Sequence, residues 1–347
     1  NSMETILGID YPTWWFLVIG GLFSGYAILD GFDFGAGAWH LFFKKELNRR
    51  IALNAVGPVW DGNEVWLVIG GGALFAGFPV MYATLFSSLY IPFMLFLIFI
   101  IFRAISIEFR GKEEMRWWRK LWDVCYSISS IMLAFLLGVV LGNVLQGFAI
   151  GENYQYTGSG FFEFLNPYAI MTGVTTLALF MAHGAIYLLL KTEGAMFEKL
   201  TNLLQKGMIF FMVSFAITTL YTLLYIPHLS DDFKSAPVLF AVPVLTFLSI
   251  ANVPRLASKK NYKLAFFFSS LTISLLLVLV AVELYPNLLF STVDPKYSID
   301  VYEAASSERS LGIMLLFVAI GGPLVLGYTF FVYRTFRGKV KLDDHSY

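Results

Sequence analysis

Charged residues and cysteine are both scarce in this sequence of 347 residues. Only 14% of the residues are charged, while 58% are hydrophobic and 18% aromatic; a soluble domain averages roughly a quarter charged residues. The one cysteine, Cys125, excludes an internal disulfide and a thiolate metal cluster built from this chain alone. Basic and acidic residues total 24 each, and no basic surface for nucleic acid is indicated. The composition is typical of a polytopic membrane protein.

Histidine is scarce too, which limits haem and metal sites. Of the four histidines, only His183 falls inside a predicted span, and it has no second histidine at ligand spacing. We therefore expect no bis-histidine haem site, no metal site and no cofactor bound by this chain. His183 is interpreted as a hydrogen-bonding residue within a helix bundle, and a role as a single haem ligand stays open.

The long apolar runs predict an all-α membrane protein in one integral-membrane domain, residues 1–347. A helix needs about 20 largely apolar residues to cross the bilayer. Nine segments qualify, at roughly 14–36, 58–78, 80–102, 122–148, 167–190, 207–226, 237–252, 263–284 and 311–333. The longest loop on the outer side, 285–310, is predicted to hold a short surface helix at 301–307.

The basic residues orient these spans. Of the 24 lysines and arginines, all but Lys234, Lys296 and Arg309 fall on one side of the predicted membrane. Because positive charge accumulates in cytoplasmic loops, the N-terminus is predicted outside and the C-terminus in the cytoplasm.

The stretch Gly57-Pro-Val-Trp-Asp-Gly-Asn-Glu-Val-Trp-Leu67 places two acids, Asp61 and Glu64, at the start of a predicted span. An ionised side chain inside the bilayer costs roughly 2.5–3.5 kcal/mol on insertion scales, so acids kept there are expected to have a function. Their spacing puts both on one face of a helix, beside Trp60. The alternative is that an acid in the first helical turn only stabilises the helix dipole.

A second pair of acids, Asp30 and Asp33, lies near the inner end of the first predicted span. Counted from Trp14 on the outside, the helix has advanced about 24 Å at Asp30, against a hydrocarbon core of about 30 Å. Asp61 lies one turn in from the cytoplasm, so the four carboxyls are predicted to share one depth on adjacent antiparallel helices. The pattern predicts a route for protons or cations from the cytoplasm.

Other polar and small residues are given structural interpretations. Arg103, at the inner end of the third predicted span, is interpreted as part of a solvated rim that lies close enough to the second span to pair with an acid. Asn143 and Gln146, near the outer end of the fourth, are interpreted as hydrogen-bonding groups between helices. Glycine pairs with a spacing of four are expected to let helices pack closely: Gly21 and Gly25, Gly31 and Gly35, and Gly138 and Gly142.

Five segments of the chain resemble subunit II of the cytochrome bd quinol oxidases, in their order, their spacing and the number of spans. They are Asp30-Gly-Phe-Asp-Phe-Gly35, the Gly57–Leu67 stretch, Gly71-Gly-Ala-Leu-Phe-Ala76, Phe102-Arg103 and Gly142-Asn-Val-Leu-Gln-Gly147. The Trp-Asp-Gly-Asn motif is the most specific of these signals.

The resemblance implies a respiratory oxidase that oxidises quinol and reduces O2 to water. It implies two four-helix bundles plus one peripheral helix for this chain, and haem b558, haem b595 and haem d in a partner, subunit I. A small single-span subunit, and membrane lipid or quinone, are further partners that it leaves open.

The resemblance also implies roles for individual residues. Asp61 matches the acid of a proton pathway through subunit II, with Trp60 as its packing partner near the subunit interface. Asp30 and Asp33 match the acids of the family's first helix, whereas Glu64 stands where the family accepts Gln. Other residues of the matching motifs are expected to support the pathway: Asn63, Trp66, Arg103, Asn143 and Gln146.

Two other functions fit the residues alone. Acids inside membrane spans also line the paths of proton- or cation-coupled secondary transporters, although these often have paired broken helices in two halves, and the sequence shows no such pair. The chain could also be a purely structural partner of the haem subunit.

The charge bias makes a topological prediction. A tag fused after Tyr347 should be cytoplasmic, and a tag within 285–310 should be external. Labelling of a cysteine placed at residue 115 tests this in intact cells with a membrane-impermeant thiol reagent. Labelling from the outside would contradict the orientation.

Overall fold

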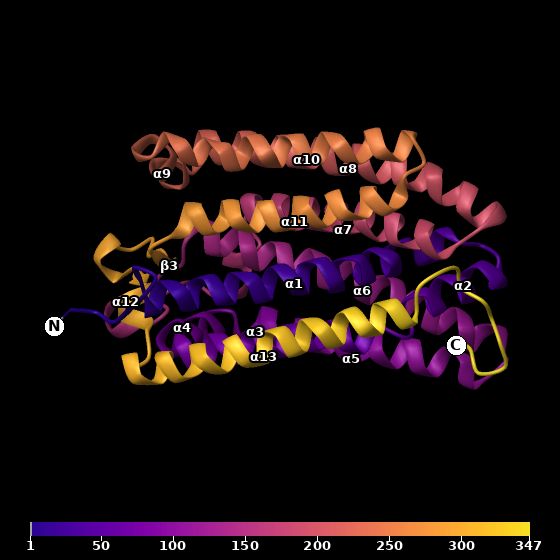
Figure 1. Cartoon of the computed structure of the whole chain (residues 1–347), viewed down its shortest axis with the longest axis horizontal. Helices are drawn as coiled ribbons and strands as arrows, with labels where there is room; N and C mark the ends of the chain where they lie inside the picture. Colours follow the sequence, from indigo (N-terminus) through magenta and orange to yellow (C-terminus); the bar gives the residue numbers. More distant parts are fainter. Residues whose placement is uncertain (1) are drawn as a thin grey trace.

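The computed structural model describes residues 2–347, and long helices laid side by side make up most of it (Figure 1). Eight helices within these residues are long and apolar enough to cross a membrane, and a bent pair, α3 with α4, brings the number to nine. The long helices are α1 (Tyr11–Trp39), α3 (Trp60–Gly77), α5 (Tyr90–Phe109), α6 (Arg116–Gln146), α7 (Pro167–Lys191), α8 (Gly194–Tyr225), α10 (Ala241–Ser258), α11 (Tyr262–Leu284) and α13 (Glu308–Thr335).

Short elements lie at the two ends of this array. The end that carries the N-terminus also carries α9 (Asp231–Ser235), α12 (Val301–Ala304) and two antiparallel strand pairs; α2 (Glu46–Val56) lies at the opposite end, with the C-terminus (Figure 1). The strands are β1 (Thr5–Ile6) with β2 (Ile9–Asp10), and β3 (Asn287–Leu289) with β4 (Ile299–Asp300). The predicted surface helix of the outer loop is thus present as α12, although it ends three residues earlier.

Local chemistry fixes where the central helices start. Asp10 caps α1, its carboxylate accepting a hydrogen bond from the Thr13 N–H at 2.9 Å, and Pro12 stands in the first turn. Asn166 caps α7 in the same way, and Pro167 occupies the first helical position. Such caps satisfy amide groups that a helix start leaves without intrahelical partners.

Glycines bring α7 into close contact with its neighbours. A Cβ atom added to Gly35 of α1 would lie 1.8 Å from the carbonyl oxygen of Phe180, and one added to Gly138 of α6 would lie 2.5 Å from Gly173. Only glycine permits helix backbones to approach this closely. The packing role predicted for these pairs is therefore confirmed at both crossings. The packing role does not hold at Gly21. A Cβ atom added there would have no atom of a neighbouring described element within 4 Å.

The predicted third span, 80–102, needs correction. The chain bends by 120° between α3 and α4 (Pro79–Ser88), and the membrane-length helix begins only at Tyr90. Pro79 explains the break, because proline lacks an amide N–H and starts a helix readily. The freed carbonyl groups are satisfied by Ser306, whose N–H donates to Gly77 at 2.9 Å and whose hydroxyl donates to Ala76 at 2.5 Å.

The remaining predicted spans correspond to single helices, with different ends. The seventh begins with a short 3-10 turn at Pro237–Phe240 and continues as α10 through Pro254. The ninth, α13, is the least buried of the candidate spans and packs mainly against α1. An all-α membrane fold is confirmed, while the division of the other helices into two four-helix bundles stays a prediction.

Candidate functional site

The site lies where α1, α3 and α5 meet. α1 contributes Asp30 and Asp33, α3 contributes Asn63 and Glu64, and α5 contributes Arg103. Both aspartates and the arginine are fully buried, with none of their surface exposed. The structure therefore brings together three of the four acids that the sequence singles out.

A buried ion pair forms the centre of this site. Nη2 of Arg103 donates to Oδ1 of Asp33 at 2.9 Å, and Nδ2 of Asn63 donates to Oδ2 of Asp33 at 2.7 Å. The hydroxyl of Tyr333, on α13, donates to Oδ1 of Asn63 at 2.5 Å. The guanidinium of Arg103 also lies 4.9 Å from the ring centre of Phe34. Both oxygens of Asp33 are thus satisfied, as a buried carboxylate requires.

Arg103 lies elsewhere than the sequence analysis predicts. It does not belong to a solvated rim; it is wholly buried, and its partner is Asp33 on the first span. Glu64 of the second span is more distant, with Oε1 at 3.8 Å from Nη1 of Arg103. Arg110, in the turn that follows α5, is also buried and pairs with Asp123 of α6 at 2.6 Å.

Several polar atoms around the ion pair are buried but not hydrogen-bonded. Within residues 2–347, neither oxygen of Asp30 has a partner, and the same holds for the hydroxyls of Tyr26 and Tyr126 and for Oε1 of Glu64. An ionised carboxylate buried without hydrogen bonds costs several kcal/mol, which favours the protonated form of Asp30. A carboxyl in this position is suited to hold a proton and to release it.

Asp61 lies differently from the other three acids. It stands in the first turn of α3 and is exposed, and among the described residues it forms no side-chain hydrogen bond or ion pair. Trp60 beside it is buried, as is Trp66, whose ring packs against Gly25 of α1. The predicted common face of Asp61 and Glu64 thus sits at the edge between the core and the outer surface.

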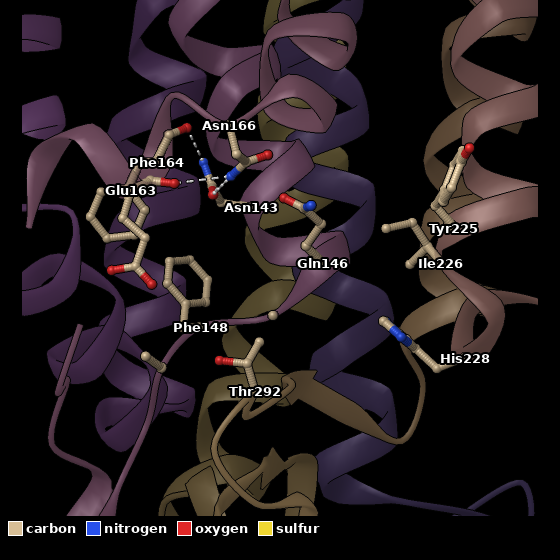
Figure 2. Close-up of a pocket in the computed structure, with 12 residues that line it drawn as sticks. Asn143, Gln146, Phe148, Glu163, Phe164, Asn166, Tyr225, Ile226, His228 and Thr292 are labelled. Carbon is tan, nitrogen blue, oxygen red and sulfur yellow. Dashed lines mark hydrogen bonds between the residues drawn. The ribbon is translucent and has the colours of Figure 1, made fainter. Parts of the chain in front are cut away.

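Asn143 and Gln146 lie at the other end of the molecule, in a pocket of about 400 Å³ (Figure 2). Nδ2 of Asn143 donates to the carbonyls of Val139 and Phe164, both at 2.9 Å, and its Oδ1 accepts from Nδ2 of Asn166 at 3.1 Å. These bonds tie α6 to the start of α7. The two residues do not belong to the acid cluster.

One buried charge cluster was missed by the sequence reasoning. Nε2 of His40 lies 2.5 Å from Oδ1 of Asp123, and that carboxylate also accepts from Arg110 and from Arg49 at 3.0 Å. The sequence places His40 outside the predicted spans and gives no partner for Asp123. The available signal was an acid near the start of a predicted span.

His183 is held by protein atoms on both sides of its ring. Nδ1 lies 2.7 Å from the hydroxyl of Ser269, and Nε2 lies 2.9 Å from the carbonyl oxygen of Ile28. In the part of the chain that the structure describes, no group of three or more histidine, cysteine, aspartate or glutamate residues is arranged to hold a metal ion.

The sequence and the fold of this chain both match known proteins. Residues 11–336 match the family described as cytochrome bd terminal oxidase subunit II. The chain belongs to this family. The resemblance found in the sequence is thereby confirmed, and a secondary transporter is not favoured. As a subunit II, the chain is part of a terminal quinol oxidase, which is an oxidoreductase complex.

Curated relatives and a solved structure agree along the whole length. The chain is 33% identical to a probable cytochrome oxidase subunit 2 of Haemophilus influenzae, with 96% of each chain covered. It is 31% identical to the cytochrome bd-I ubiquinol oxidase subunit 2 of Escherichia coli K12, with 97% of each covered. It is 32% identical to the cytochrome bd ubiquinol oxidase subunit 2 of Bacillus subtilis, with 94% of this chain and 96% of the relative covered.

The fold is similar to a chain of the bd oxidase from Geobacillus thermodenitrificans. The TM-score is 0.75 at 20% identity, with 94% of this chain and 98% of that chain covered.

The ion pair generates a stability prediction. Arg103→Met and Asp33→Asn should each destabilise subunit II in the assembled oxidase by about 3–5 kcal/mol, because each leaves one charge buried without its partner. The double variant should lose clearly less than the sum of the two single losses. Thermal unfolding of the purified complex measures all three, and additive losses would show that the two side chains are not coupled.

Proposed function

We propose that this subunit II works with a haem-bearing subunit I as a quinol:O2 oxidoreductase, and that it supplies part of the route by which cytoplasmic protons reach the oxygen site. The observation that carries the proposal is the buried cluster of Asp30, Asp33 and Arg103, next to Glu64 and Asp61 of α3. Buried ionisable groups in membrane helices characteristically line ion or proton paths. The E. coli and B. subtilis relatives are named as subunits of ubiquinol oxidases, which supports ubiquinol as the substrate of the complex.

The outer face of α3 supports docking to subunit I. Beginning at Asp61, exposed residues recur along this helix at helical spacing and include apolar side chains and two glycines: Asp61, Gly62, Val65, Val68, Ile69, Gly72 and Phe75. Such a surface allows another helix to approach closely. Lipid tails would leave the Asp61 carboxyl without any polar neighbour, so a protein partner suits this face better than lipid does.

We place haem b558, haem b595 and haem d in subunit I. Two features of this chain support that assignment. Both ring nitrogens of His183 are engaged by Ser269 and Ile28, and Nε2 of His40 is engaged by Asp123. Iron bound by His183 would have to displace one of its two contacts.

Protons would pass through this chain by exchange between side chains and water. Asp30 is suited to store a proton, since an ionised form would lie buried beside other acids. The ion pair of Arg103 with Asp33 keeps the cluster close to neutral. Glu64 lies between this cluster and the exposed edge of α3. Asp61, on that edge, transfers the proton to the partner subunit. Uptake from the cytoplasm fits the orientation predicted from the basic residues, with the chain spanning the bacterial inner membrane.

Asp61→Asn tests the proposal. An amide has nearly the shape of a carboxyl but cannot exchange a proton, so quinol-driven O2 consumption should fall at least about ten-fold per haem d. The visible spectrum should be unchanged, because the variant adds no buried charge. Asp61→Glu should keep part of the activity.

Asp344→Asn is the matched control, since Asp344 is an exposed acid in the C-terminal segment. It should leave turnover unchanged. Full activity per haem d in Asp61→Asn would remove Asp61 from the proton path.

A further inference from the structure

Buried polar residues line the contact between α1 and α6. On α1, such residues recur every three to four positions, at Tyr26, Asp30 and Asp33, and the line continues to His40 just beyond the helix. On α6, the buried polar residues also recur at helical spacing: Asp123, Tyr126, Ser127 and Ser130. We call these eight residues the α1–α6 seam.

The two halves of the seam are in direct contact. A Cβ atom added to Gly37, which lies between Asp33 and His40, would be 2.0 Å from the hydroxyl oxygen of Ser130 and 3.3 Å from Cζ of Tyr126. The absence of a side chain at Gly37 is therefore what allows the polar face of α6 to reach α1. The seam leads from the acid cluster toward the end of the molecule that carries α2 (Figure 1).

At its outer limit the buried seam is linked by ion pairs to the predicted cytoplasmic surface. Asp123 pairs with Arg110, and Arg110 pairs with Glu46 of α2 at 2.8 Å; the Glu46 side chain is 48% exposed. His40 faces the same carboxylate through Nε2. Within the described residues its Nδ1 is buried and has no partner. When Nε2 carries the hydrogen that Asp123 accepts, Nδ1 presents a lone pair that can accept a proton.

Tyr126 connects the two charge clusters. Its ring lies edge-on to His40, with ring centres 4.9 Å apart, and the guanidinium carbon of Arg103 lies 5.8 Å from its ring centre. Its hydroxyl is buried and, in residues 2–347, has no hydrogen-bond partner. A buried hydroxyl without a partner costs free energy that phenylalanine would avoid at nearly the same shape. Within the described residues, Nε and Nη1 of Arg103 are likewise buried without a hydrogen-bond partner, so a tyrosine oxygen here can interact with that guanidinium as well as exchange a proton.

We propose that the α1–α6 seam is a proton-uptake branch contained wholly within subunit II, with His40 and Asp123 as its cytoplasmic end and Tyr126 as the relay to the cluster of Asp30, Asp33 and Arg103. This branch rests on the proposed function, because it feeds the cluster that hands protons on through Glu64 and Asp61.

The relay conserves protons. His40 binds one at Nδ1 and releases it from the same atom to water or to the oxygen of Tyr126. Tyr126 accepts that proton on its oxygen lone pair as its own hydroxyl proton passes on toward Asp30. Each residue ends in the state in which it began, and no electron or covalent bond is involved.

The test is Tyr126→Phe in the assembled oxidase. Turnover per haem d, and the rate of proton uptake after an oxygen pulse followed with a pH-indicator dye, should both fall about ten-fold, with a larger solvent deuterium isotope effect. Tyr168→Phe is the matched control: it also removes a buried hydroxyl, one that is hydrogen-bonded to Thr222 at 2.9 Å, at the other end of the bundle. That control should not change proton uptake.

Unchanged turnover and proton uptake in Tyr126→Phe would overturn the proposal and leave the seam with a packing role. If Asp61→Asn slows turnover while Tyr126→Phe does not, only the seam fails; if neither does, the proposed function fails as well. Should Tyr126→Phe lose haem d, His40→Gln answers the same question, because its amide can still donate to Asp123 but offers no basic nitrogen. Normal proton uptake in His40→Gln would then overturn the proposal.

Discussion

The ion pair between Arg103 and Asp33 is the interaction on which the rest of the site depends. It joins α5 to α1 with no surface of either residue exposed, and Asn63 and Tyr333 extend it to α3 and α13. The burial of these two charges is tolerated because they pair with each other and because Asn63 donates a second hydrogen bond to Asp33. Four helices are thereby held around one polar centre, and the pair fixes the electrostatic surroundings of Asp30.

The packing of the helices around this polar centre places the residues that the proposed proton route uses. Glycines let α1, α6 and α7 approach closely, and at Gly37 this brings the polar side chains of Ser130 and Tyr126 against α1. On the other side, α3 presents an exposed row of glycines and apolar residues that starts at Asp61. In the function proposed for this chain it contributes to oxygen chemistry by moving protons, and its polar residues lie between an inner surface and a face suited to a partner.

Much of this could be predicted from the sequence, because span length and membrane acids are local signals. The spans and the special status of Asp30, Asp33 and Glu64 follow from apolar runs and from the cost of charge in lipid. The partner of Arg103 could not be predicted, since Asp33 is 70 residues away and pairing depends on how α1 and α5 are placed. The pair of His40 with Asp123 spans 83 residues and was missed for the same reason. The predicted spans already separate at Pro79, but the second break, at Leu89 between α4 and α5, was hidden by an unbroken apolar run.

The central claim is that the buried carboxyls of α1 take up and release protons as the oxidase turns over. Redox-induced infrared difference spectroscopy of the whole complex tests this most directly, because a protonated carboxyl has its own carbonyl stretch that shifts in deuterated water. A carbonyl-stretch feature should appear in the unmodified complex and be lost in Asp30→Asn while the haem spectra stay unchanged. Identical difference spectra in the two proteins would contradict the account.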